Sequence, residues 1–301
     1  MKRILVTGKN GQLGWELQKA LRSLGDVIAL SREQLDLTDF QGIRRKVRET
    51  RPDIVVNAAG YTAVDQAEDH PEAARLINAI APAVLAEEAK KIQALFIHYS
   101  TDYVFDGAKA SPYVESDPTN PLNVYGRTKL EGEKAIEAIG GSHLIFRTSW
   151  LYSLRGQNFA FSILRLARER DEVRVVDDQI GVPNWSRVIA EATAQVAAEA
   201  WRHIDASTFG DLKGIYHLSG AGAISWFQFA REIVNVAGDC NRTEGAQRPA
   251  GKIVNISTAE YSSRTTRPKY SVLSSAKLQR TFGIVPSRWD EQLRRAFSEP
   301  A

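Results

Sequence analysis

The stretch "TGKNGQLGWEL" (residues 7–17) follows a short apolar run, "RILVT" (3–7), and decides the fold. Its glycines, Gly8, Gly11 and Gly14, have the spacing G-x-x-G-x-x-G. Small residues let the backbone turn tightly and approach a pyrophosphate, and the following helix offers free N–H groups and a positive dipole end. Because the glycines lie between a strand and a helix, they predict a dinucleotide-binding turn. A plain packing turn is the alternative.

Strand-like and helix-like segments alternate through the first half of the chain. The predicted strands cover residues 3–7, 27–30, 53–59, 94–100 and 143–150. The predicted helices begin near Leu13 and cover 38–50 and 71–91, with a kink at Pro82, and a further helix holds Tyr125. Strands that are apolar on both faces and are joined by helices predict a doubly wound parallel sheet of the Rossmann type, an α/β fold.

The second half is less regular and predicts a smaller α/β domain for substrate binding. Helices are expected at 158–169, 186–201, 225–238 and 289–299, strands at 173–183 and 214–220, and a polar, Arg-rich loop region at 241–272. We assign residues 1–150 to the dinucleotide-binding domain, with 173–206 returning to it. Residues 151–172 and 207–301 form the predicted substrate-binding domain.

Composition is ordinary for a soluble globular protein and argues against several other classes. Of 301 residues, 43% are hydrophobic and 25% charged, and the formal net charge is 39 − 36 = +3. This balance is too mild to indicate nucleic-acid binding, and no apolar run is long enough to span a membrane. The start lacks the features of a signal peptide. A single cysteine, Cys240, fits a reducing compartment, so we expect a cytoplasmic protein.

The second predicted strand ends in "ALSRE", where a dinucleotide's adenosine ribose is expected to lie. A carboxylate at this point favours NAD, but here Ser31 leaves room and Arg32 can pair with a 2′-phosphate. The pattern favours NADPH, and NADH stays an open alternative. Arg32 could also be an ordinary solvated arginine with no role in binding. We expect these residues to bind the cofactor: Gly8, Asn10, Gly11, Gln12, Leu13, Gly14, Ser31, Arg32, Ala58, Ala59 and Gly60. The family resemblance described below adds Asp36, Leu37, Tyr125 and Lys129 to this set.

Tyr125 and Lys129 in "NVYGRTKLEGEKA" (123–135) are about one helical turn apart, so they share a helix face. The pair fits a phenol whose pKa an adjacent ammonium lowers, but equally fits a buried ring beside a solvated lysine. "HYSTDYVFDG" (98–107) ends the fourth predicted strand and places Thr101 at the carboxyl edge of the sheet, where ligands bind.

Taken together, the motifs resemble one family closely, the dTDP-4-dehydrorhamnose reductases of the extended short-chain dehydrogenase/reductase superfamily. Those that carry the resemblance are "TGKNGQLGWEL", "VNAAGYTAVDQAE", "HYSTDYVFDG", "PLNVYGRTKLEGE", "FRTSWLY", "NFAFSILRLA" and "VVDDQIGVP", continued by "GIYHLSG" and "RPKYSVL". The resemblance implies NADPH-dependent reduction of the 4-keto group of dTDP-4-dehydro-β-L-rhamnose, the last step of dTDP-rhamnose biosynthesis for cell-surface polysaccharide.

The same resemblance assigns roles to individual residues. Thr101, Tyr125 and Lys129 are the expected catalytic residues, with Tyr125 exchanging the proton. The expected substrate-binding residues are Thr101, Asp102, Tyr125, Trp150, Asn158 and Arg267. Tyr103 stands where the related dehydratases carry a glutamate, which argues against dehydration.

Some alternatives stay open at this stage. Certain family members dimerise through a magnesium site, and Glu16 and Glu191 are candidate ligands; we predict no metal site, leave Mg²⁺ uncertain and regard a homodimer as an open expectation. A non-catalytic, NADP-binding regulatory subunit of the methionine adenosyltransferase type shares the expected fold. A reductase of another 4-keto-deoxysugar nucleotide is a further alternative.

Overall fold

A computed structural model describes residues 2–203, 209–241 and 251–299. Its centre is a parallel sheet of six strands in the order β10-β5-β4-β3-β1-β2. The strands are β1 (Lys2–Thr7), β2 (Gly25–Leu30), β3 (Ile54–Asn57), β4 (Leu95–Thr101), β5 (His143–Thr148) and β10 (Gly214–His217). The strand order reverses direction between β1 and β3, and a ligand crevice is expected at such a point.

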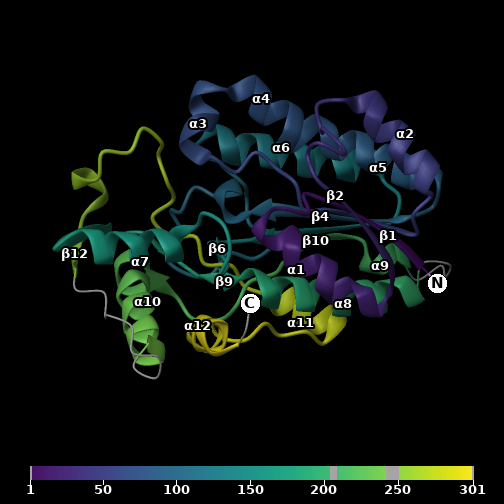
Figure 1. Cartoon of the computed structure of the whole chain (residues 1–301). Coiled ribbons are helices and arrows are strands. Elements are labelled where there is room, and N and C mark those ends of the chain that lie inside the picture. The colour runs from purple at the N-terminus through teal and green to yellow at the C-terminus, as the bar shows by residue number, and fades with distance from the viewer. Residues whose placement is uncertain (1, 204–208, 242–250, 300–301) are drawn as a thin grey trace.

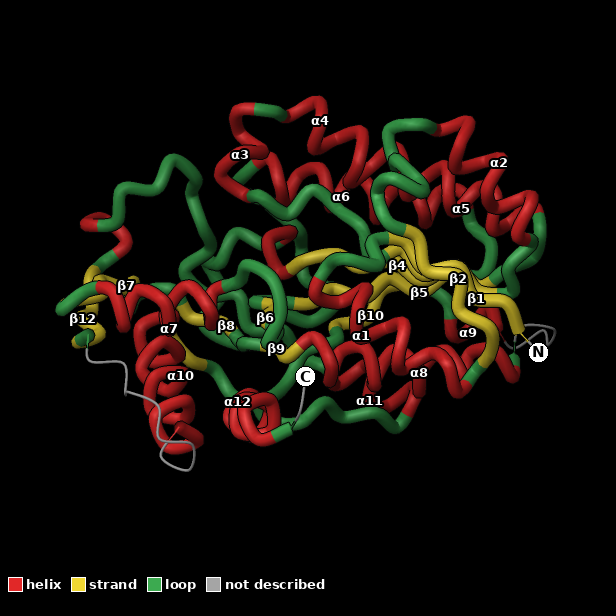
Figure 2. The backbone as a smooth tube through the Cα atoms, in the orientation of Figure 1, coloured by secondary structure: helices red, strands yellow, loops and turns green. Residues whose placement is uncertain are grey.

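Helices cover both faces of this sheet (Figures 1 and 2). One face carries α2 (Phe40–Thr50), α3 (Val64–Asp69), α4 (Pro71–Arg75), α5 (Ala81–Lys91) and α6 (Val124–Ile139). The other carries α1 (Gln12–Ala20), α8 (Ser186–Arg202) and α11 (Ala276–Phe282). A short α9 (Phe209–Leu212) precedes β10. The predicted doubly wound parallel sheet is therefore confirmed.

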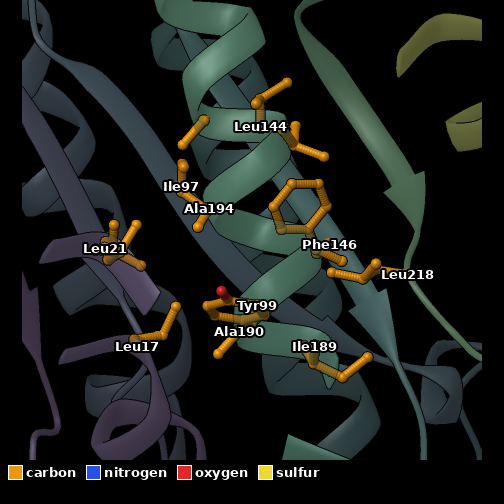
Figure 3. Packing of buried hydrophobic residues seen from close by; sticks show 14 of the residues in the cluster. Leu17, Leu21, Ile97, Tyr99, Leu144, Phe146, Ile189, Ala190, Ala194 and Leu218 are labelled. Carbon is orange, nitrogen blue, oxygen red and sulfur yellow. The ribbon is translucent and has the colours of Figure 1, made fainter. Parts of the chain in front are cut away.

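Figure 3 shows how α8 closes the core on one face of the sheet. Three residues are fully buried against strand residues: Leu17 of α1, Leu21 of the 3₁₀ turn that follows it (Leu21–Ser23), and Ile189 of α8. The strand residues that the figure labels are Ile97, Tyr99, Leu144 and Phe146. The Tyr99 hydroxyl shares a 2.7 Å hydrogen bond with Thr193 of α8, so its polar end is satisfied within the core.

A second hydrophobic cluster lies beside the sheet, at the left of Figure 1. It is built by α7 (Phe159–Glu169), α10 (Trp226–Asn241), α12 (Trp289–Ser298) and the parallel pair β7 (Glu172–Val176) and β12 (Lys252–Ile256). Two small strand pairs join it to the sheet: β6 (Leu151–Tyr152) with β9 (Asn184–Trp185), and β8 (Ile180–Gly181) with β11 (Ile224–Ser225).

Three local features differ from the sequence predictions. The helix expected at 71–91 is interrupted by a π-helical turn at Leu76–Ile80, and Pro82 lies in the first turn of α5, where its missing N–H costs little. The loop region expected at 241–272 contains β12, since residues 252–256 pair with β7. Residues 242–250 lie outside the described ranges. β10, from the part assigned to the second domain, joins the central sheet; the domain bounds themselves stay a prediction.

Candidate active site

A cavity of about 950 Å³ opens at the carboxyl ends of β1, β3, β4 and β5. Almost every residue predicted to bind a ligand lines it, although these residues come from distant parts of the chain. The predicted residues in its lining are Gly8, Asn10, Gly11, Gln12, Leu13, Ser31, Arg32, Asp36, Leu37, Ala58, Ala59, Gly60, Thr101, Asp102, Tyr125, Lys129 and Trp150. The structure therefore brings the predicted cofactor and reaction residues to one place.

The glycine turn is shaped by two close backbone approaches. Gly8 has φ = 75°, and a Cβ built on it would lie 2.9 Å from the backbone nitrogen of Ala59. A Cβ on Gly14 would lie 2.0 Å from the carbonyl oxygen of Gly8. Gly14 does not line the cavity; it lets α1 pack directly behind the turn. Neither position accepts a larger residue without movement of the turn.

The beginning of α1 fits a negatively charged diphosphate. Its N-cap, Gly11, makes no side-chain capping bond, and no acidic residue lies in the first turn. Backbone N–H groups at this end therefore remain available. These features fit a dinucleotide diphosphate.

The far end of the cavity carries the predicted ribose determinants. The Arg32 side chain is 80% exposed and lies 3.8 Å from the Asp36 carboxylate, so it is free to meet a phosphate. Asp36 accepts hydrogen bonds from the backbone and hydroxyl of Thr38, which lower its pKa. Ser31 is buried, and Glu33 also lines this end.

The three predicted reaction residues meet beneath the middle of the cavity. Thr101 ends β4, while Tyr125 and Lys129 lie on α6. Asn123 caps α6 by accepting from the Gly126 N–H at 2.8 Å. A Cβ on Gly126 would lie 2.2 Å from the Tyr103 carbonyl oxygen, so this glycine lets α6 approach the strand end closely. The helix cap and this contact hold Tyr125 beside Thr101.

Burial controls the protonation of this group. It raises the pKa of Tyr125 to about 12, against a smaller lowering by its hydrogen bond with Thr101. It also lowers the pKa of Lys129 to about 8. The Lys129 Nζ atom donates to the Tyr99 carbonyl oxygen at 2.5 Å and lies 3.3 Å from Nε2 of His98. The predicted lowering of the Tyr125 pKa by Lys129 is not found in the structure. The Lys129 ammonium is turned towards β4.

Asp102 is a second buried acid at the reaction centre. Thr101 donates to its Oδ1 at 3.0 Å, whereas Oδ2 is buried with no hydrogen-bond partner among the described residues. Burial raises the pKa of Asp102 to about 7. The Tyr103 ring packs edge-on against Tyr125, with 5.8 Å between the ring centroids. Asp102 therefore lines the cavity as a buried carboxyl group, and the Ser271 hydroxyl opposes the rise in its pKa.

A pair of stacked tryptophans forms part of the cavity wall. Trp150 follows β5 with φ = 43° and stacks on Trp226 of α10, with 3.5 Å between centroids and 9° between planes. Gly181 makes room for the Trp150 ring, since a Cβ there would lie 2.4 Å from it. Both rings line the cavity. Sequence analysis found Trp150 but missed Trp226.

Two predicted substrate residues do not line the cavity. The Asn158 side chain caps α7 by accepting from the Phe161 N–H, and it donates to the Ser153 and Arg155 carbonyls. Arg267 makes a two-bond ion pair with Asp65, at 2.9 and 2.8 Å. Both side chains are therefore engaged in holding loops, and their roles toward a substrate stay predictions.

The acidic residues considered for magnesium are engaged with arginines. Glu16 pairs with Arg187 at 3.1 Å, and Glu191 pairs with Arg295 at 2.8 Å. Among the described residues, no group of three or more His, Cys, Asp or Glu side chains is arranged to hold a metal ion.

Within the same residues, no helix is both long and apolar enough to cross a membrane.

Several cavity residues were missed by sequence reasoning because no distinguishing motif marks them, whether they lie in loops or on α3 and α10. They are Glu33, Tyr61, Thr62, Val64, Gln66, Ser149, Gln157 and Trp226. The "GYTAV" segment, directly after the third strand, carried a usable signal, since every strand end faces the cavity. Trp226 carried none, because its helix is distant in sequence and an aromatic residue there is expected in any core.

The doubly wound fold, the glycine turn and the Thr–Tyr–Lys group together define a dinucleotide-binding oxidoreductase of the short-chain dehydrogenase/reductase type. The chain belongs to the family described as RmlD substrate binding domain, which it matches over residues 1–301. It is 48% identical over 288 residues to a dTDP-4-dehydrorhamnose reductase of Burkholderia thailandensis, and the match covers 95% of each chain.

Solved structures agree with this assignment. A dTDP-4-dehydrorhamnose reductase from Clostridium acetobutylicum aligns with a TM-score of 0.88 and 36% identity, covering 98% of both chains. The enzyme of the same name from Bacillus anthracis, solved in complex with NADP, aligns with a TM-score of 0.86 and 33% identity, covering 99% of both. The predicted family is therefore confirmed.

Proposed function

We propose that this protein reduces the 4-keto group of dTDP-4-dehydro-β-L-rhamnose to give dTDP-L-rhamnose, with NADPH as the reductant. The observation that carries the proposal is the meeting of Thr101, Tyr125 and Lys129 in one cavity with the glycine turn. The reductase names of relatives that align along the whole chain support the substrate, and the NADP complex of one neighbour supports the cofactor.

The cofactor residues of the proposal divide by the part of NADPH that they meet. The turn at Gly8 and Gly11 and the start of α1 hold the diphosphate, while Ser31 and Arg32 receive the 2′-phosphate. Ala58, Ala59 and Gly60 let the cofactor pass close to the backbone. Asp36 and Leu37 lie beside the adenine. When bound, NADPH supplies the hydride that carbon 4 of the sugar receives.

Tyr125 is the proton donor in this proposal. Its raised pKa keeps the phenol protonated at neutral pH, so it has a proton to give to the ketone oxygen as negative charge develops there. Thr101 bonds the same oxygen and fixes its position. Lys129 stabilises the resulting phenolate and holds the nicotinamide ribose, which requires its ammonium form. The sugar gains one hydride and one proton, which balances the reduction.

The sugar nucleotide is assigned to the side of the cavity that faces the second hydrophobic cluster. Trp226 supports this assignment, because it brings α10 of that cluster into the cavity lining beside Trp150. Asp102 offers a buried oxygen to a sugar hydroxyl. The division into a dinucleotide domain and a substrate domain, and the substrate roles of Asn158 and Arg267, are part of the same proposal.

The test measures NADPH oxidation, as loss of nicotinamide absorbance, after adding dTDP-4-dehydro-β-L-rhamnose to the purified protein. We expect rapid oxidation by the wild type and a loss of about 10²-fold or more in kcat for Tyr125→Phe. Tyr261→Phe is the matched control, since Tyr261 is exposed and does not line the cavity.

Two results would count against the proposal. Tight NADPH binding without oxidation would remove the reductase assignment and favour the regulatory-subunit alternative. Faster turnover of a different 4-keto-deoxysugar nucleotide would keep the chemistry but change the substrate. The same assay run with NADH compares the two cofactors directly.

A further inference from the structure

His98 is a buried imidazole behind the reaction centre that the proposed mechanism does not use. It lies on β4 with no exposed surface and does not line the cavity. Its Nε2 atom is 3.3 Å from Nζ of Lys129, and its Nδ1 atom is 3.0 Å from Nδ2 of Asn57. The Thr7 hydroxyl in turn donates to Oδ1 of Asn57 at 2.5 Å. A buried line of polar groups thus runs from the end of β1 to Lys129.

The hydrogen-bond donors and acceptors along this line indicate which ring nitrogen of His98 carries its hydrogen. An ammonium can only donate, so His98 must present an unprotonated Nε2 to Lys129 and carry its hydrogen on Nδ1. Nδ1–H then needs an acceptor, which the Asn57 amide provides when its oxygen faces the ring and its NH₂ group faces Thr7. In the structure the amide nitrogen faces the ring and the oxygen faces Thr7. A half-turn of the carboxamide exchanges the two atoms and gives the required arrangement with the same heavy-atom contacts.

We propose that His98 is a positioning residue for Lys129: as a neutral acceptor held by Asn57, it keeps the Lys129 ammonium charged and fixed beneath the cavity. The inference rests on the proposed function, in which Lys129 acts as an ammonium. The Tyr99 carbonyl is the second fixed acceptor, at 2.5 Å. Two acceptors from adjacent residues of β4 thus set the direction of the side chain, and one donor position remains for the cavity.

The surrounding charges do not make His98 redundant. From α6 itself, Glu133 favours the ammonium of Lys129, but Glu133 already makes a two-bond ion pair with Arg147 of β5, at 2.9 and 2.6 Å. Tyr125, also on α6, is neutral. Burial and the nearby ammonium hold the pKa of His98 well below its usual range, so the imidazole stays an acceptor.

Removing the acceptor has a defined consequence for Lys129. Its ammonium, already weakened by burial to a pKa of about 8, would lose one of its two fixed hydrogen bonds. The pKa of Lys129 in His98→Phe should therefore fall by about one unit or more. The fall in kcat at alkaline pH should move to lower pH by the same amount, with little change in the KM for substrate.

The experiment labels lysine Cε with ¹³C and titrates the Lys129 signal by NMR, with Lys129→Arg used to assign it. This readout needs neither substrate nor turnover, so it is independent of the proposed reaction. His98→Gln keeps an acceptor and should leave the pKa within about half a unit of the wild type. His143→Phe is the matched control, since His143 is a buried histidine that does not line the cavity.

A Lys129 pKa in His98→Phe equal to that of the wild type would overturn the inference, whether or not the protein reduces the sugar. If His98→Phe does not fold, Asn57→Ala provides the test. It leaves the imidazole in place but removes the acceptor of Nδ1–H, so it should lower the same pKa. An unchanged pKa in that variant would also overturn the inference. Absence of turnover in the wild type would count against the proposed function alone.

Discussion

At the reaction centre, burial rather than ion pairing sets the protonation of three residues. It raises the pKa of Tyr125 to about 12 and that of Asp102 to about 7, and lowers that of Lys129 to about 8. Near pH 7 the site therefore holds a protonated phenol, an ammonium and a carboxyl group that keeps its proton to a higher pH than an exposed aspartate does. This combination suits a group that donates a proton to a ketone oxygen.

Asp102 makes the protein less stable as the pH rises. Its pKa is raised from 3.8 to about 7, so the folded state holds a proton that the unfolded state releases. The associated stability is fully present below about pH 4 and is lost as the pH rises through 7. Asp102→Asn should therefore raise the free energy of unfolding at pH 8 by up to about 4 kcal/mol, with no gain at pH 4.

Urea unfolding at the two pH values measures this difference. Asp106→Asn is a control whose effect on stability should have the opposite sign. Hydrogen bonds lower the pKa of Asp106, and the largest effect comes from the Ala108 N–H. Its contribution to stability is present above pH 4 and is lost as the pH falls. An Asp102→Asn variant that is equally destabilised at both pH values would show that the carboxyl group is not held neutral by burial.

Arg32 should decide between the two nicotinamide cofactors. Its side chain is 80% exposed and makes only a long contact with Asp36, so it can form an ion pair with a 2′-phosphate. Arg32→Ala should lower the ratio of kcat/KM for NADPH to that for NADH by about 10- to 100-fold, the value of a charged hydrogen-bonding pair. Arg22→Ala, at an exposed position that does not line the cavity, should leave the ratio unchanged. If Arg32→Ala leaves the ratio of kcat/KM for NADPH to that for NADH unchanged, Arg32 does not determine the preference for NADPH.

The strand–turn–helix element around β1 and α1 depends on Gly14, which does not line the cavity. A Cβ on Gly14 would lie 2.0 Å from the Gly8 carbonyl oxygen. Gly14→Ala should cost about 1–3 kcal/mol and weaken NADPH binding, because the turn must shift away from α1. Thermal unfolding with and without NADPH measures both effects. Gly210→Ala, which has open space, is the control; equal behaviour of the two variants would contradict a tight turn.

Elements with strong local patterns were predictable from sequence. The glycine turn, the five apolar strands and the helix with Tyr125 and Lys129 follow from periodicity and turn chemistry, and each lies close to its predicted bounds. Because strand ends meet at one edge of a doubly wound sheet, the cavity residues after β1, β3 and β4 could also be predicted.

Features that depend on contacts between distant elements could not be predicted. The π-helical turn at Leu76–Ile80 places Asn78 to bond Thr128 of α6 and the backbone of Tyr61, and no local pattern signals this. β12 was predicted as loop because its short sequence, KIVNI, lies within a longer polar, Arg-rich segment, and its strand pairing with β7 joins distant parts of the chain. The orientation of Lys129 towards β4 likewise depends on His98, which a helix pattern does not reveal.

At the scale of the whole molecule, arginine ion pairs occupy the acidic residues considered for magnesium. Glu16 with Arg187, and Glu191 with Arg295, link α1, α8 and α12 without a metal. Chelation with EDTA should therefore leave the melting temperature and the oligomeric state of the purified protein unchanged. A drop in the melting temperature that Mg²⁺ restores would contradict this reading of the ion pairs. Whether the protein forms a homodimer stays a prediction that sedimentation can test.

Transfer of hydrogen from the cofactor to the sugar is the most direct test of the proposed reaction. The protein would be incubated with dTDP-4-dehydro-β-L-rhamnose and NADPH carrying deuterium at the reactive C4 position of the nicotinamide, on each face in turn. We expect a dTDP-sugar product with one deuterium at carbon 4 from one of the two labelled cofactors, and none in Tyr125→Phe over the same period. A wild-type product without deuterium at carbon 4 from either cofactor, or no product at all, would contradict the proposed function.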